Sequence, residues 1–381
     1  KPEIRFAGFT NDWEQRKLGE IVERVTRKNQ DLVSELPLTI SAQYGLIDQN
    51  EFFDKRVASK DVSGYYLIYN GEFAYNKSTS SDAPWGAIKR LDRYENGVLS
   101  TLYIVFRIKN EDILNSDFLM NYYDTNNWHK DIQAIASEGA RNHGLLNIAP
   151  ADFFETELML PQDIEEQKNI GNYFKSLNNL ITLHQRKCDE TKKLKKFMLQ
   201  KMFPKKDAKK PEIRFAGFTN DWEQRKLNEV AEFNPKSELP DEFEYVDLES
   251  VVGTEMISHR TETKDSAPSR AQRLAQPGDV FFQTVRPYQK NNYLFSKLDN
   301  NYVFSTGYAQ MRPNIDTAFL MSFLQTDSFV KIVLDNCTGT SYPAINSSDL
   351  SNLEISLPKS FEEQKKVGKT IISIDNLITL H

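Results

Sequence analysis

The chain begins with eighteen residues that recur unchanged further along. The segment KPEIRFAGFTNDWEQRKL occupies residues 1–18 and again residues 210–227, an offset of 209. The later segment EEQK occupies residues 165–168 and again 362–365, an offset of 197, so the first copy is twelve residues longer. A repeat decides the architecture, and 381 residues suit two domains with a connection. The sequence therefore predicts two versions of one domain.

The middle of each copy carries short aromatic and β-branched runs between turn signals, the pattern of β-strands. In the first copy, residues 65–69, the Asn70-Gly71 turn and residues 73–75 predict a hairpin, and Asn96-Gly97 precedes an alternating run over 99–108. In the second copy, residues 302–306 and 308–311 supply comparable strands. Each copy is thus predicted to be a mixed α/β globule that leads into a helix, an α+β fold with an internal pseudo-twofold repeat.

A helical pattern begins after Pro161 and again after Pro358. Asp163 with Glu166, and Ser360 with Glu363, are spaced as capping boxes at the two helix starts. Apolar positions then recur in steps of four and three, a heptad pattern typical of a coiled-coil seam. The predicted seam residues are Ile170, Phe174, Leu177, Ile181, His184 and Cys188 in the first helix, and Val367, Ile371, Ile374, Ile378 and His381 in the second. We interpret the two histidines as packed interface residues rather than metal ligands.

These patterns divide the chain into five segments. We expect a globular domain over 1–160, a spacer helix of about forty residues and roughly 60 Å over 161–204, a lysine-rich linker over 205–212, a second globular domain over 213–358, and a second helix over 359–381. The second helix stops at the equivalent of His184. We interpret that end as truncation or disorder.

Charge is distributed unevenly along the chain. The formal net charge is −6, which argues against a uniformly basic DNA-binding surface. Residues 185–210 hold eleven Lys or Arg against three acids, so DNA contact must use local patches or a partner. No run of eighteen apolar residues and no signal-peptide stretch occurs, which favours the cytoplasm and no membrane. Cys188 and Cys337 lie in dissimilar contexts, so a disulfide framework is not expected.

Common catalytic motifs are absent from the sequence, which has no GxxxxGK(S/T) loop, no HExxH, no CxxC pair and no glycine-rich methyltransferase loop. Asp241, Glu262 and Lys264 imitate the set with which nucleases hold Mg²⁺, and a stand-alone nuclease is one alternative. Such a site needs two adjacent strands, whereas residues 253–270 are polar and predict a loop. A purely structural coiled-coil scaffold is another alternative.

Several segments, in the same order in both copies, are typical of one protein family. They are RFAGF at 5–9 and WEQRKL at 13–18 with their copies, Leu-Pro at 160–161 and 357–358 followed by Gln167 and Gln364, ITLH at 181–184 and 378–381, ISAQYGL at 40–46, and GEFAYNK at 71–77. Over nearly its whole length the chain resembles the specificity subunits of type I restriction-modification systems, the HsdS family.

The resemblance implies two target recognition domains, each holding one half of a split sequence in double-stranded DNA, and two long helices that pair as an antiparallel coiled coil. It also implies partners. Two methyltransferase (HsdM) subunits would bring S-adenosylmethionine and methylate adenine, and restriction (HsdR) subunits that translocate and cleave would use ATP and Mg²⁺. The chain itself is then expected to be a non-catalytic subunit with no cofactor or metal of its own.

Base reading in the major groove needs amide, hydroxyl and guanidinium groups on loops. The candidate DNA-binding residues are Gln43, Tyr44, Asn76, Lys77, Ser78, Thr79, Ser80, Arg141, Asn142 and His143 in the first domain, and Thr284, Arg286, Tyr288, Gln289, Lys290, Thr340, Ser341 and Tyr342 in the second. Their loops occupy matching places while their letters differ, which suits two different half-sites. We interpret the repeated Phe6, Phe9 and Trp13, with Phe215, Phe218 and Trp222, as packing of the shared frame.

Overall fold

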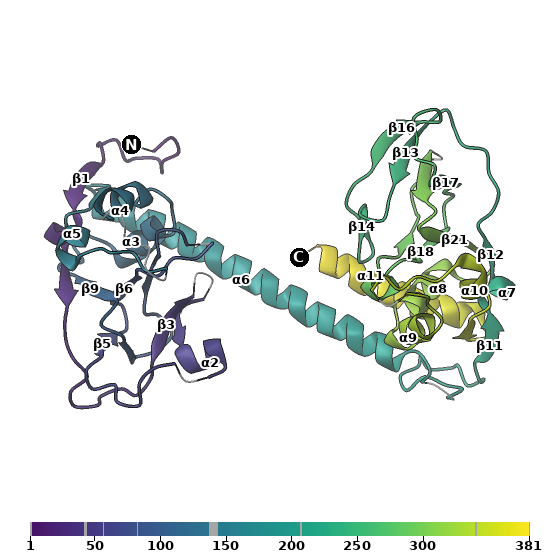
Figure 1. Cartoon of the computed structure of the whole chain (residues 1–381), viewed down its shortest axis with the longest axis horizontal. Helices are drawn as coiled ribbons and strands as arrows, with labels where there is room; N and C mark the ends of the chain where they lie inside the picture. The colour runs from purple at the N-terminus through teal and green to yellow at the C-terminus, as the bar shows by residue number, and fades with distance from the viewer. Residues whose placement is uncertain are drawn as a thin grey trace. The chain divides into compact units, whose positions relative to one another are not determined.

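The chain divides into two compact units, Lys1–Ile181 (unit 1) and Thr182–His381 (unit 2), and the division falls inside the longest helix, α6 (Ile164–Lys201) (Figure 1). The structure is a computed structural model that describes residues 2–41, 44–55, 57–81, 83–136, 144–205, 208–299, 301–339 and 341–380. Each unit has its own hydrophobic cores.

Unit 1 is built on an antiparallel four-stranded sheet. Its strands are β1 (Glu14–Lys17), β2 (Val22–Val25), β3 (Leu38–Ser41), β4 (Gly45–Asp48), β5 (Tyr66–Tyr69), β6 (Phe73–Asn76), β7 (Ala87–Arg90), β8 (Asn96–Leu99), β9 (Ile104–Ile108) and β10 (Glu157–Leu160), and its helices before α6 are α1 (Leu18–Ile21), α2 (Gln49–Phe53), α3 (Ser116–Tyr123), α4 (His129–Ile135) and α5 (Pro150–Phe154). The sheet has the order β2-β9-β6-β7, and β1–β10, β3–β4 and β5–β8 form separate pairs. Its core stacks Phe73 on Phe106 and Tyr75 on Phe153.

The predicted hairpin around Asn70-Gly71 is wrong. β5 pairs with β8, whereas β6 pairs with β7 and β9, so the turn carries the chain from one sheet to another. The buried carboxylate of Glu72 explains the corner, because it accepts the backbone N–H of Tyr69 at 2.8 Å and binds the guanidinium of Arg27 at 2.8 Å. These bonds direct β6 away from β5, the strand that precedes it in the sequence.

Unit 2 repeats this sheet and adds a second one. Its strands are β11 (Glu223–Lys226), β12 (Ala231–Phe233), β13 (Glu242–Val246), β14 (Val251–Val252), β15 (Glu255–Met256), β16 (Arg260–Thr263), β17 (Ala271–Leu274), β18 (Val280–Gln283), β19 (Tyr293–Leu294), β20 (Tyr302–Ser305), β21 (Tyr308–Pro313) and β22 (Glu354–Leu357), and its helices are α7 (Leu227–Val230), η1 (Pro287–Gln289), α8 (Thr317–Leu324), α9 (Asp327–Asp335), α10 (Ser347–Ser351) and α11 (Phe361–Thr379). The order β12-β21-β18-β19 matches that of unit 1. The second sheet, β16-β13-β20-β17, has no four-stranded counterpart among the described residues of unit 1.

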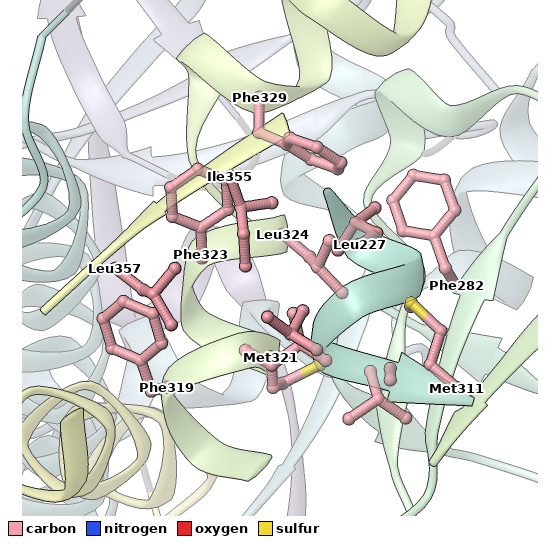
Figure 2. Packing of buried hydrophobic residues seen from close by; sticks show 14 of the residues in the cluster. Leu227, Phe282, Met311, Phe319, Met321, Phe323, Leu324, Phe329, Ile355 and Leu357 are labelled. Carbon is pink, nitrogen blue, oxygen red and sulfur yellow. The ribbon is translucent and has the colours of Figure 1, made fainter. Parts of the chain in front are cut away.

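The core of unit 2 lies between the repeated sheet and its helices. In this core (Figure 2), the ring of Phe329 of α9 lies 5.5 Å from that of Phe323 of α8 and 6.1 Å from that of the sheet residue Phe282. Both helices begin with a side-chain cap, from Asp316 and Thr326 respectively. The α+β fold with an internal repeat is therefore confirmed.

The repeated sequence block forms the same polar cluster in each unit, in which an arginine and a tryptophan of the block bind a buried glutamate in the first turn of a helix. We call this cluster the lock. In unit 1 the guanidinium of Arg5 binds both carboxylate oxygens of Glu166, at 2.6 and 2.7 Å, and the Trp13 indole N–H donates to the same carboxylate. In unit 2, Arg214 and Trp222 bind Glu363 in the same way. This arrangement supports the interpretation of the repeated residues as frame.

The lock also corrects the predicted capping boxes. Asp163 and Ser360 do cap the helices, since their side chains accept the N–H groups of Glu165 and Glu363. The glutamate side chains, however, turn to the arginine and tryptophan of the repeated block instead of returning to the cap. A bidentate ion pair with arginine outweighs the single bond that the same carboxylate would make to the backbone N–H of the cap residue.

The long helix is confirmed, since α6 spans 38 residues. Its seam residues in unit 1 are exposed or half-buried, with Phe174 45% and Ile181 54% exposed. In unit 2, Val367, Ile371 and Ile374 of α11 are buried, and α11 lies against α8. Along the last turns of α6, α11 runs antiparallel to it (Figure 1), with Lys195 bound to Asp375 and Met202 in the shared core. His184 is exposed, and His381 lies outside the described residues.

Within the described residues, no single helix has the length and apolar content to cross a membrane. α8 and α9 reach that composition only together, across a 66° bend, and both bury apolar side chains in the core of unit 2.

Candidate nucleic-acid interface

In unit 1, the polar run after β6 is paired with a loop near the end of the domain. Ser78 forms an isolated β-bridge with Leu145. The Thr79 N–H donates to the Gly144 carbonyl at 2.6 Å, and the Leu146 N–H donates to the Lys77 carbonyl at 2.9 Å. The structure thus brings the run over residues 76–81 beside the segment that follows residue 143.

In unit 2, the run after β18 is paired in the same way. Val285 forms an isolated bridge with Ala344. The Arg286 N–H donates to the Pro343 carbonyl at 2.8 Å, and the Ile345 N–H donates to the Thr284 carbonyl at 3.0 Å. β6 and β18 hold the same place in their sheets, so the two loop pairs are structural equivalents. Thr79 and Arg286 therefore occupy one backbone position in the repeat.

Side chains of the unit 1 loop pair are partly used internally. The Lys77 ammonium donates to the Ile148 carbonyl at 3.2 Å, and burial, aided by the nearby Arg24, lowers its pKa. The Thr79 hydroxyl donates to the Gly144 carbonyl at 3.0 Å. Asn76 and Ser80 accept backbone N–H groups of their own turn. Ser78 and Ser80 are exposed, as is Tyr44 at the β3–β4 turn.

The unit 2 loop pair presents an arginine held against an aromatic ring. The Arg286 guanidinium lies 4.4 Å from the centroid of the Tyr342 ring, which is 64% exposed. Arg286 and Lys290, on either side of η1, have φ of +53° and +56°, a left-handed conformation that is costly outside glycine. Such strain persists only where the surroundings fix the backbone.

Two candidates in unit 2 use their side chains for bonds within the protein. Thr284 is buried, and its hydroxyl donates to the Gly307 carbonyl at 2.8 Å. The Lys290 ammonium donates to the Gln325 carbonyl at 2.9 Å and to the carboxylate of Asp327. These two side chains anchor the loop. Tyr288, Gln289 and Ser341 are exposed.

Some candidates lie outside the described residues. They are Gln43, Arg141, Asn142, His143 and Thr340.

Sequence reasoning missed a buried amide network beneath the unit 2 loop. The backbone N–H of Gln283 donates to the Asn292 side chain at 2.9 Å, and the Gln283 amide donates to the Gln289 side-chain oxygen at 2.9 Å. Gln283 and Asn292 are both buried. The available signal was a glutamine that ends an otherwise apolar strand, because a buried polar group needs a partner.

The structure overturns the loop prediction that argues against the nuclease alternative, but it adds no support for a nuclease site. Residues 260–263 form β16 beside β13, so the predicted loop is wrong and the two strands are adjacent. The Glu262 carboxylate, however, binds the Arg260 guanidinium at 2.8 Å. No group of three or more His, Cys, Asp or Glu suited to a metal occurs in the part of the chain that the structure describes.

The chain matches the type I restriction modification DNA specificity domain twice, over residues 10–193 and 219–381. It is 24% identical over 392 residues to the type I restriction enzyme MjaVIII specificity subunit of Methanocaldococcus jannaschii, with 97% of this chain and 87% of that protein covered. It is 24% identical over 176 residues to the HindI specificity subunit of Haemophilus influenzae, covering 42% and 37%. The S subunit of a type I restriction-modification system from M. genitalium shares the fold, with a TM-score of 0.62 at 13% identity, covering 100% of this chain and 93% of that one.

The two matched regions take in the repeated sheet and the loop pair of each unit, so each unit is a DNA specificity domain. The chain belongs to the family of type I restriction-modification specificity subunits, with two target recognition domains.

Proposed function

We propose that the chain reads the two halves of a bipartite double-stranded DNA sequence with its two loop pairs and supplies no catalytic group. One observation carries this proposal. The two loop pairs have equivalent backbone hydrogen bonds but different side chains, with Thr79 in unit 1 where unit 2 has Arg286. Equivalent placement with different hydrogen-bonding groups suits two different half-sites.

Chemistry on the DNA then belongs to partner subunits. Two methyltransferase (HsdM) subunits carry S-adenosylmethionine and methylate adenine, and restriction (HsdR) subunits use ATP and Mg²⁺. The relatives' names as specificity subunits of restriction enzymes support such an assembly. The lock residues Arg5, Trp13 and Glu166 and their unit 2 copies supply the same frame to both recognition domains.

The test exchanges residues 20–160 for the corresponding segment of a relative with a different target. The full chain is produced with its methyltransferase subunit, and methylated sites are mapped across the host genome. We expect one half of the methylated sequence to change and the other half to stay. An unchanged sequence, or a change in both halves, would contradict the proposal.

A further inference from the structure

We propose that Arg286 reads a guanine in the DNA half-site of unit 2. The inference rests on the proposed function and deepens it by naming one base. It starts from the rigidity of the loop that carries Arg286. Thr284 is bonded to Gly307 before it, and Lys290 is bonded to Gln325 after it. The Arg286 N–H itself is bonded to Pro343, so the backbone is fixed on both sides and at the residue.

The guanidinium of Arg286 is also held in place. It lies over the Tyr342 ring at 4.4 Å, a cation–π contact that orients the planar group. A cation–π contact engages the charge of the guanidinium and takes up none of its N–H groups in a hydrogen bond to oxygen. A preorganised fork loses less entropy on binding than a mobile side chain.

Among the described residues, Arg286 has no acidic partner, unlike several other arginines of the chain. Arg5, Arg214 and Arg312 each bind a carboxylate within 3 Å. Within the described ranges, no carboxylate lies at ion-pair distance from the Arg286 guanidinium, and none of its side-chain N–H groups donates a hydrogen bond. Arg286 is half-buried and its backbone is strained, yet its N–H donors are free. This combination suits an arginine that binds an acceptor outside the protein.

The chemistry of that acceptor follows from the shape of the fork. In the major groove, guanine alone presents two acceptors on one base edge, O6 and N7, at the spacing of two guanidinium N–H groups. A phosphate would accept the same donors but carries no sequence information. The neighbouring Gln289 has its oxygen engaged by Gln283, so it too offers N–H donors toward the loop surface.

The equivalent position in unit 1 has the opposite character. The Thr79 hydroxyl hydrogen is committed to the Gly144 carbonyl, so its oxygen can only accept. An acceptor suits the amino group of adenine or cytosine, whereas the donors of Arg286 suit guanine. At this backbone position unit 1 therefore offers an acceptor and unit 2 offers donors, so the guanine requirement that comes from this position belongs to the half-site of unit 2.

The experiment maps methylated sites with the full chain and its methyltransferase subunit, comparing wild type with Arg286→Ala and Arg286→Lys. We expect a G·C pair in the half-site of unit 2, and in both variants a loss of preference for it of about ten- to a hundred-fold, with the other half-site unchanged. Lysine keeps the charge but not the fork, so it separates base reading from phosphate contact.

Three outcomes would overturn the assignment. They are an unchanged sequence in Arg286→Ala, full rescue by Arg286→Lys, and complete loss of methylation in Arg286→Lys while the complex stays assembled. Arg225→Ala, an exposed arginine on β11 outside both loop pairs, serves as a control that keeps the G·C requirement. Failure of the proposed function is distinguishable, because the wild-type chain would then direct no bipartite sequence at all.

Discussion

The same aromatic notch exists in both units, and among the residues that the structure describes it holds a further aromatic ring only in unit 2. There, Trp222, Phe319 and Phe323 surround Phe203, which follows α6, with ring centroids 6.1, 5.6 and 5.7 Å away. In unit 1 the equivalents are Trp13, Phe118 and Tyr122. Together with Ile170 and Phe174 they line a pocket of about 290 Å³.

In unit 2 the repeated block contacts the end of α6 and the residues that follow it. In unit 2, Glu212 binds Lys201 and Lys205, and the Ile213 N–H donates to the Lys201 carbonyl at 2.9 Å. In unit 2 the repeated block thus holds the end of α6 through the buried ring of Phe203 and two lysines. Ile4 of unit 1, the equivalent of Ile213, is 91% exposed against 37%. Identity in the repeat marks packing within the protein, whereas the loop pairs that we propose to contact DNA differ in their side chains.

The largest effect is expected from emptying the unit 2 notch. Phe203→Ala removes a buried ring from three aromatic neighbours, and we expect it to lower the free energy of unfolding of unit 2 by about 3–5 kcal/mol. Phe197→Ala, within α6 and 47% exposed, is the matched control and should cost far less. Amide exchange of β11 and β22 measures the difference. Equal effects of the two variants would show that the ring of Phe203 does not stabilise unit 2.

The seam offers a direct test across the repeat, because Phe174 and Ile371 are equivalent positions. Ile371 is 1% exposed and Phe174 is 45% exposed. We expect Ile371→Ala to destabilise unit 2 by about 2–5 kcal/mol and Phe174→Ala to destabilise unit 1 by less than about 1 kcal/mol. Amide exchange followed separately in the two sheets gives both values. A larger loss in unit 1 would show that its seam is covered in the protein.

Local sequence patterns predicted where helices and strands lie better than which strands pair. The spacing around Asp163 and Ser360 marked both helix starts, since capping chemistry is local. The Asn70-Gly71 signal, by contrast, fits a hairpin and a corner between sheets equally well. The contact between Glu72 and Arg27, far apart in the chain, decides between them. Periodicity carries no information about such partners.

The candidate interface was predictable as loops but not as side chains. Turn residues cluster after β6 and β18, so the loops could be found. Thr284 and Arg286 are both polar and two residues apart, yet the first is buried and the second stacks on Tyr342. Only the pairing with residues 343–345 separates their roles. The buried residues Gln283 and Asn292 were missed, because a sequence does not state which of its polar residues lie in the protein interior.

A smaller difference is expected at the glycines where each helix crosses its domain. A Cβ on Gly368 would lie 2.4 Å from the backbone nitrogen of Phe319, whereas one on Gly171 would lie 2.9 Å from the Cβ of Asp117. We expect Gly368→Ala to cost about 1–3 kcal/mol through overpacking. Gly171→Ala should cost less, because the helix propensity of alanine offsets milder crowding. Denaturant midpoints of the two variants measure the order, and a reversed order would contradict close packing of α11 on α8.

The smallest effect is expected in the pH dependence of stability. Contact with Lys201 and then with Lys205 lowers the pKa of Glu212 to about 2 from an ordinary value near 4.5. A lowered pKa in the folded state means that this contact stabilises fully above pH 4.5 and is lost as the pH falls toward 2. We therefore expect Glu212→Gln to be less stable than wild type at neutral pH and equal to it near pH 2. Salt should weaken the difference, because the carboxylate is exposed. Carboxyl NMR titration locates the pKa, and a value near 4.5 would show that the block does not hold the end of α6 by charge.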